Sequence, residues 1–270
     1  MINKNFALLK TSLFIGFLIL IGLFSGCSEK ETAKPRLTIV CGTGLRKAVD
    51  KVIAKFEINN NIDIEPVYYG SGIALTYARE HEEVDMFMPG DLWYVNRLEE
   101  LTKNVEIKRT VSFFVPTIIV KKGNPKKIIQ LKDFFRDNVT IAIGNSKACQ
   151  IGRLTKKIFK KNDMDITKKE SKKSLTVNEL GVWVKMGDVD ATIVWDAIAT
   201  NIADSVDIIQ IPKEKNIIST VVISSLKTSR NKENTKKFID FITGDTGRSI
   251  LKSCNYHLDT PYSSTKMEKN

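Results

Sequence analysis

The chain has 270 residues and a formal net charge of +11 at pH 7, from 42 lysines and arginines against 31 aspartates and glutamates. A basic surface suits an anionic ligand, anionic lipid headgroups or nucleic acid. Nucleic acid is disfavoured, because the sequence has no recognisable reader motif and its basic residues are not interleaved with aromatic ones. Catalysis is disfavoured as well, since neither His81 nor His257 has an evident partner and Cys149 has no assigned base.

The N-terminus has the features of an export signal. Lys4 and Lys10 precede a short apolar run that contains no acidic residue and leads into Ser-Gly-Cys27. This ending resembles the lipidation signal of bacterial lipoproteins. We therefore expect a signal peptide over residues 1–26, lipidation at Cys27 and a polar tether over residues 27–36, so that the protein lies outside the cytoplasm on a membrane. The alternative is a plain transmembrane anchor, for which the apolar run is short.

The globular part begins with a predicted strand over residues 37–41, a tight glycine turn and an amphipathic helix over residues 45–56. The first turn of this helix has free N–H groups beside the Thr43 hydroxyl, and the absence of a side chain at Gly44 leaves room for a ligand. The turn is thus a candidate anion site. A dinucleotide fingerprint would need a further glycine where Lys47 stands. On this segment alone, an ordinary strand–helix turn that binds nothing remains equally open.

The following segments repeat the pattern of strand, turn and helix. A strand over residues 62–68 leads to a second glycine turn, which contains Ser71 and opens a helix over residues 73–80. A third strand over residues 84–88 ends before Asp91, which is expected to cap the next helix. This alternation predicts an α/β sheet of parallel strands, whose ligands bind at the carboxyl ends of the strands. Both glycine turns lie at that edge.

Two long apolar runs predict passages between two lobes. The run over residues 111–120 is interrupted by Pro116 and leads into a second strand–helix series, and the run over residues 217–224 leads back. Two crossings predict two interrupted lobes, joined by a two-strand hinge, that can trap a ligand between them. The predicted segments are residues 37–115 and 219–263 for the first lobe, 116–218 for the second lobe and 264–270 for a C-terminal tail.

Seven segments, in this order along the chain, carry a resemblance to a known family. They are GTGLRKA (42–48), YGSG (69–72), VDMFMPGD (84–91), VKKGNP (120–125), IAIGN (141–145), TIVWDA (192–197) and FIDFITGDTG (238–247). Each segment is weak alone, but the ordered set resembles the type II extracellular solute-binding proteins of ABC importers, most closely their molybdate-binding branch. The similarity covers residues 36–262. It implies a two-lobed α/β fold, in which each lobe is a doubly wound sheet, a permease as the partner, and a monomer.

The resemblance also implies a set of ligand-binding residues. The family holds a tetrahedral oxyanion between its lobes through hydroxyl groups and main-chain N–H groups. Carried over by position, the ligand-binding residues are Thr43, Gly44, Ser71, Ile151, Val177 and Trp195. Of these, Ile151 and Val177 mark main-chain donors, and Trp195 stands where the family commonly has a tyrosine. This departure leaves the exact specificity open.

The chemistry of these residues agrees with an oxyanion. A fully ionised dianion such as molybdate, tungstate or sulfate can only accept hydrogen bonds, and Thr43, Ser71 and Trp195 can donate them. Phosphate keeps a proton near neutral pH and would favour an acceptor, a role open to Asp196, although a helix cap is the simpler interpretation of that residue. Whether the ligand is molybdate, tungstate or sulfate depends on the size of the cavity.

Other functions remain as alternatives. A ligand sensor could use the same fold, and an amino acid could bind if Arg46 gripped its carboxylate and Asp91 its amine. No metal site or cofactor is expected, because no residues have zinc-ligand spacing. The cysteines other than Cys27 are an odd number at scattered positions, and they are expected to be small buried residues: Cys41, Cys149 and Cys254.

Overall fold

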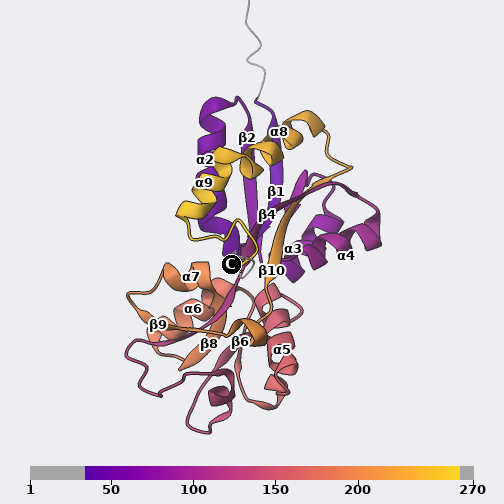
Figure 1. Ribbon diagram of the computed structural model, residues 1–270. Coiled ribbons are helices and arrows are strands. Elements are labelled where there is room, and N and C mark those ends of the chain that lie inside the picture. The colour runs from indigo at the N-terminus through magenta and orange to yellow at the C-terminus, as the bar shows by residue number, and fades with distance from the viewer. Residues whose placement is uncertain (1–33, 262–270) are drawn as a thin grey trace, which may run out of the picture. The chain divides into compact units, whose positions relative to one another are not determined.

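The computed structural model describes residues 34–261. The predicted signal peptide, Cys27, most of the predicted tether and the predicted C-terminal tail lie outside the described residues. Between residues 34 and 261 the chain folds into two α/β lobes, as the sequence predicts (Figure 1). No helix in this part of the chain is both long and apolar enough to cross a membrane.

The first lobe contains a five-stranded sheet in the order β2-β1-β3-β10-β4. β1 is parallel to β2 and β3, whereas β10 is antiparallel to β3 and β4. In chain order, its elements are β1 (Arg36–Gly42), the short 3₁₀ helix η1 (Thr43–Leu45), α2 (Arg46–Asn59), β2 (Asp63–Tyr69), α3 (Ser71–Glu80), β3 (Met86–Met88), α4 (Leu92–Thr102), β4 (Val105–Phe114), β10 (Ser219–Leu226), α8 (Lys232–Thr243) and α9 (Asp245–Ser253).

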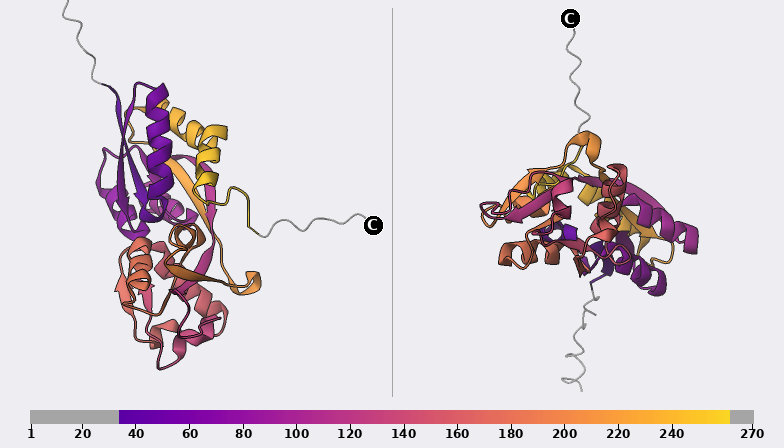
Figure 2. Two further views of the ribbon diagram at one scale, coloured as in Figure 1. Left: turned by 90° about the vertical axis from the view of Figure 1, so that its left-hand side faces the viewer. Right: turned by 90° about the horizontal axis from the view of Figure 1, so that it is seen from below.

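Helices cover both faces of this sheet, because successive side chains of a strand point to opposite faces. Leu37 and Ile39 of β1 belong to the core beneath α2, α8 and α9, in which the rings of Phe56 and Phe238 meet edge to face at 5.2 Å between centroids. Val40 belongs to the core beneath α3 and α4. Figure 2 shows α2 beside α8 and α9. The helix predicted to be amphipathic, α2, buries its apolar face.

The second lobe has a three-stranded sheet in the order β8-β5-β9 and a two-stranded sheet of β6 and β7. β5 is antiparallel to β8 and β9, β6 is parallel to β7, and a parallel bridge between Ile141 and Ala191 joins the two groups. Its elements are β5 (Pro116–Lys121), η2 (Leu131–Phe135), β6 (Ala142–Gly144), α5 (Gln150–Lys161), η3 (Ile166–Lys168), β7 (Lys172–Ser174), α6 (Val177–Met186), β8 (Ala191–Trp195), α7 (Asp196–Thr200), β9 (Val206–Gln210) and η4 (Lys213–Lys215). The chain enters this lobe through Val115, between β4 and β5, and leaves it between β9 and β10.

Neither lobe is built of parallel strands alone, which corrects the expectation from the sequence. The two strands that follow a crossing, β5 and β10, run antiparallel to their neighbours. A strand that enters its sheet from the hinge must run away from the cleft, whereas strands such as β1 and β8 run toward it. The two-strand crossing itself imposes the reversal.

The sequence predicted one strand only in part and did not predict another. The first half of β4 carries exposed charged residues, so only its apolar second half was predicted. β7 falls in a lysine-rich stretch without an apolar run, and two of its three residues are exposed. Both lie at an edge of their sheet, where few side chains are buried and the sequence therefore lacks a clear apolar pattern.

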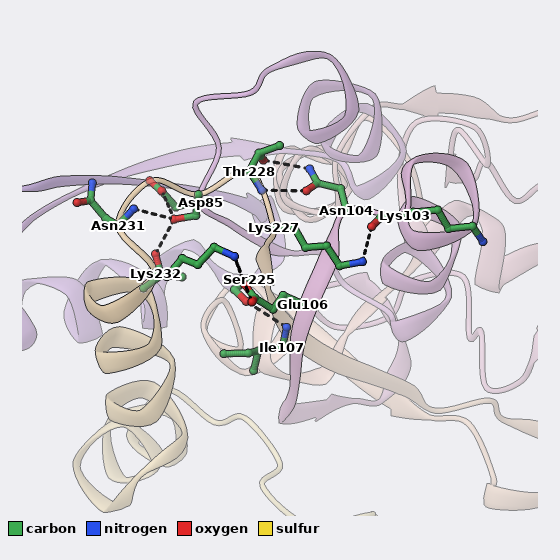
Figure 3. A network of polar contacts seen from close by, with 12 residues as sticks. Asp85, Lys103, Asn104, Glu106, Ile107, Ser225, Lys227, Thr228, Asn231 and Lys232 are labelled. Atoms are coloured by element: carbon green, nitrogen blue, oxygen red, sulfur yellow. Dashed lines mark hydrogen bonds and ion pairs between the residues drawn. The ribbon is translucent and has the colours of Figure 1, made fainter.

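A polar network fixes the end of the first lobe that lies away from the cleft (Figure 3). The buried Asp85 accepts hydrogen bonds from the Thr38 N–H at 2.8 Å and from the Ser229 hydroxyl at 2.6 Å. Nearby, Asn104 exchanges two hydrogen bonds with Thr228, at 3.0 and 3.1 Å. These contacts tie the segment after β10 to the starts of β1 and β4.

We expect the substitution Asp85→Ala to lower the free energy of unfolding by about 2–4 kcal/mol, because it leaves two buried donors without their charged acceptor. The exposed Glu82, three residues earlier, provides a control, and Glu82→Ala should change stability by less than about 0.5 kcal/mol. Urea titration followed by circular dichroism measures both values. Equal midpoints for the two variants would contradict the role assigned to Asp85.

Candidate ligand-binding site

One small cavity lies where the two lobes meet. Its lining comes from both lobes and is made up of Gly42, Thr43, Gly44, Gly70, Ser71, Gly90, Phe114, Cys149, Gln150, Ile151, Val177 and Trp195. The cavity leaves about 20 Å³ for the centre of a water-sized molecule. All six residues predicted to bind the ligand line it, and no residue of the lining carries a charge.

Helix N-termini supply main-chain donors from the first lobe. η1 begins at Thr43 and α3 begins at Ser71, and no side chain caps either helix. The first N–H groups of such a helix have no partner within it. In α3 the Gly72 and Ile73 N–H groups donate to the Ala148 carbonyl of the second lobe, at 2.8 and 3.4 Å. The Ser71 N–H is therefore the one left for a ligand.

Ser71 lines the cavity, and its hydroxyl is available as a donor. Ser71 is only 4% exposed, and its oxygen accepts a hydrogen bond from the Gly90 N–H at 3.0 Å. Because that bond occupies an acceptor position, the hydroxyl proton stays free for a ligand. The Thr43 hydroxyl has no hydrogen-bond partner among residues 34–261.

The second lobe contributes the starts of α5 and α6. Ile151 is the second residue of α5, whose N-cap residue, Cys149, makes no side-chain cap. Thr176 caps α6 through the Glu179 N–H, which leaves the Val177 N–H without a partner inside the helix. Burial raises the pKa of the Cys149 thiol to about 11, so the sulfur in the lining stays neutral near pH 7.

Trp195 closes the cavity at the end of β8. Its indole stacks on Phe114, with centroids 4.7 Å apart and planes at 15°, and Phe114 packs in turn on Tyr256. The Tyr256 hydroxyl donates to the Gly44 carbonyl. The sequence did not identify Phe114, Tyr256 or Gln150 as part of this site. Phe114 lies in an apolar run and Tyr256 in a segment without a periodic pattern, and Gln150 is the first residue of an ordinary helix.

Asp196 does not line the cavity. Its position is the first residue of α7 rather than the expected cap, and its carboxylate approaches His257 Nε2 at 2.5 Å. Burial raises the pKa of Asp196, and the His257 contact acts in the opposite direction. The expectation that His257 lacks a partner was therefore wrong. Asp196 is also not placed to accept a proton from a ligand in the cavity.

Arg46 and Asp91, the pair that an amino acid would need, lie outside the lining as well. The Arg46 guanidinium lies over the Tyr68 ring, 4.4 Å from its centroid. Asp91 caps α4 by accepting from the Trp93 N–H at 2.9 Å, as the sequence predicts. The geometry therefore gives an amino acid neither of its two charged partners.

Glycines allow the lobes to meet around the cavity. A Cβ atom on Gly72 would lie 1.8 Å from the Lys147 carbonyl oxygen, and one on Gly70 would lie 2.4 Å from the Leu175 carbonyl oxygen. On the other side of the contact, the Lys47 ammonium donates to the Asn201 amide oxygen at 2.6 Å. Any larger residue at Gly70 or Gly72 would push main-chain atoms of the two lobes apart.

The chain matches the family model described as bacterial extracellular solute-binding protein over residues 37–254, and it belongs to this family. A "Putative binding protein" of Haemophilus influenzae is 28% identical over 217 residues, which cover 78% of this chain and 86% of that protein. Two solved structures share the fold. One is a periplasmic molybdate-binding protein of Azotobacter vinelandii (TM-score 0.71, 15% identity, 83% of this chain and 99% of that one). The other is the sulfate-binding protein SubI of Mycobacterium tuberculosis (TM-score 0.74, 15% identity, 84% and 88%).

We expect Gly72→Ala to weaken ligand binding by at least about tenfold, because the added methyl group opposes contact between the lobes. The helix itself should tolerate the change, since alanine is favourable inside a helix such as α3. Gly181→Ala in α6 is the control, because a Cβ atom there meets only side-chain atoms of Ile198 and Ile202 within its own lobe. Calorimetric titration of both variants gives the comparison, and equal affinities would show that this contact does not limit binding.

Proposed function

We propose that the protein captures a tetrahedral oxyanion, with molybdate or tungstate as the preferred ligand, and delivers it to the permease of an ABC importer. The observation that carries the proposal is the uncharged cavity into which four helix N-termini and two hydroxyl groups converge. A dianion that only accepts hydrogen bonds needs such donors, and helix N-termini favour negative charge.

The nature of the lining argues for a fully ionised anion. A carboxylate would repel a dianion, and an ammonium or guanidinium group is not needed where enough N–H and O–H donors are preorganised. Trp195 adds a donor that cannot accept. Relatives of the same fold bind molybdate in one case and sulfate in another, so sulfate is the competing ligand.

The proposed role includes anchoring to a membrane. In this view Cys27 carries the lipid, the signal peptide is removed, and the two lobes work outside the cytoplasm as the family description implies. Binding rather than catalysis is the proposed activity, and the protein acts as a monomer.

Calorimetric titration of an unlipidated chain over residues 28–270 with molybdate, tungstate, sulfate and phosphate tests the ligand. We expect molybdate and tungstate to bind well below micromolar, and sulfate and phosphate to bind more weakly. Flat traces for both molybdate and tungstate would end the assignment, and tight binding of sulfate alone would replace it.

Removing the Ser71 hydroxyl tests the location of the site. We expect Ser71→Ala to weaken binding by about 1–3 kcal/mol, the effect of losing one hydrogen bond to a buried charged ligand. Ser225 is a matched control, because it is also buried and its hydroxyl also accepts from a main-chain N–H group, that of Ile107 at 3.1 Å. Ser225→Ala should leave affinity unchanged. An unchanged affinity for Ser71→Ala would mean that the ligand binds elsewhere.

A further inference from the structure

A chain of two side-chain hydrogen bonds, one buried and one partly buried, crosses between the lobes beside the cavity. The Ser219 hydroxyl donates to Asp91 Oδ2 at 2.6 Å, and Gln150 Nε2 donates to the Ser219 oxygen at 2.9 Å. Ser219 is fully buried and Gln150 is 2% exposed. We call Asp91, Ser219 and Gln150 the interlobe clasp.

The direction of the clasp follows from its chemistry. Asp91 already accepts from the Trp93 N–H through its other carboxylate oxygen, so it acts as an acceptor on both sides. The single proton of Ser219 goes to Asp91, and the Ser219 oxygen can then only accept. Gln150 must therefore present its NH₂ group to Ser219. Its carbonyl oxygen, Oε1, is buried and has no partner among the described residues.

The clasp joins two parts of the first lobe to the start of a helix in the second lobe, and the bond between Gln150 and Ser219 is the one that lobe movement would break. Asp91 precedes α4 of the first lobe, Ser219 begins β10 just after the return crossing, and Gln150 is the first residue of α5 in the second lobe. The following residue of α5, Ile151, lines the cavity and carries one of the proposed main-chain donors. By holding Gln150, the Ser219 side chain therefore also fixes the start of α5, which faces the cavity.

A second contact joins the same two helices. The Arg153 guanidinium carbon of α5 lies 3.9 Å from the centroid of a ring of Trp93 in α4, a geometry suited to a cation–π interaction. Arg153 lies one turn after Gln150, and Trp93 lies two residues after Asp91. The first turns of α4 and α5 are thus held together by a buried contact and by a partly exposed one.

We propose that Gln150 is a positioning residue, which holds the start of α5 over the cavity through the interlobe clasp and thereby slows ligand release. The inference rests on the proposed function, because it assumes that a ligand occupies this cavity. A ligand leaves a two-lobed protein through an open arrangement, and the clasp is broken in that arrangement. Loss of the clasp raises the dissociation rate and leaves the association rate nearly unchanged.

The test compares Gln150→Met, which keeps the length of the side chain without its donor, with Ser219→Ala and with the double variant. Ser112→Ala is the control, because Ser112 is equally buried, lies on β4, and its hydroxyl has no partner within residues 34–261. Stopped-flow kinetics with the anion that the wild type binds best give both rate constants. Each single variant should dissociate about 5- to 20-fold faster, and the double variant no faster than the singles, because both remove one interaction.

Three results would overturn the proposal. The first is that both single variants match Ser112→Ala, and the second is that the two effects multiply in the double variant. The third is that Gln150→Met reorders the affinities for different anions, which would make Gln150 a ligand contact. If the wild type binds no tetrahedral anion, the proposed function fails separately. Small-angle scattering of the ligand-free protein then tests the clasp. Both single variants should have a larger radius of gyration than the wild type and Ser112→Ala. Equal radii would reject the clasp.

Discussion

The direction of the strands is the constraint from which the make-up of the cavity follows. In each lobe two neighbouring parallel strands run toward the other lobe, β1 and β2 in the first and β6 and β7 in the second. Each of the four leads into a helix, so η1, α3, α5 and α6 begin at the cleft. Unpaired main-chain N–H groups are a property of every helix start, and the topology brings four such starts to one cavity. The donors are thus supplied by the fold, and side chains only complete the set.

Much of this arrangement was predictable because it leaves local marks in the sequence. The glycine turns before Thr43 and Ser71 are tight turns between an apolar strand and an amphipathic helix, and both are found where the sequence predicted them. The crossings between the lobes were visible as long apolar runs. The antiparallel direction of β5 and β10 was not, because the hydrophobic pattern of a strand is the same in both directions.

The parts that were missed depend on distant partners. The contact between Asp196 and His257 joins residues 61 positions apart, and the bond from Tyr256 to the Gly44 carbonyl joins residues 212 positions apart. The segment that carries Tyr256 and His257 has no periodic pattern that would indicate what it packs against. Gln150 is another example, because a polar residue at the start of a helix normally faces solvent, and only the return of the chain at Ser219 gives it a buried partner.

The charge of the chain as a whole differs from the charge of the cavity lining, and the two have different effects on an anion. The chain as a whole is basic, so it attracts anions over distances of about a Debye length, roughly 8–10 Å at moderate salt. The lining has no charge, and the two carboxylates that adjoin it in sequence, Asp91 and Asp196, are held by Ser219 and His257 instead of facing the cavity. The proposed anion would therefore meet an uncharged lining, in which helix N–H groups, two hydroxyl groups and Trp195 are the donors. Under these conditions selectivity depends on the number and the geometry of hydrogen bonds that the anion can accept, and a site of this kind distinguishes anions by protonation and size rather than by charge alone.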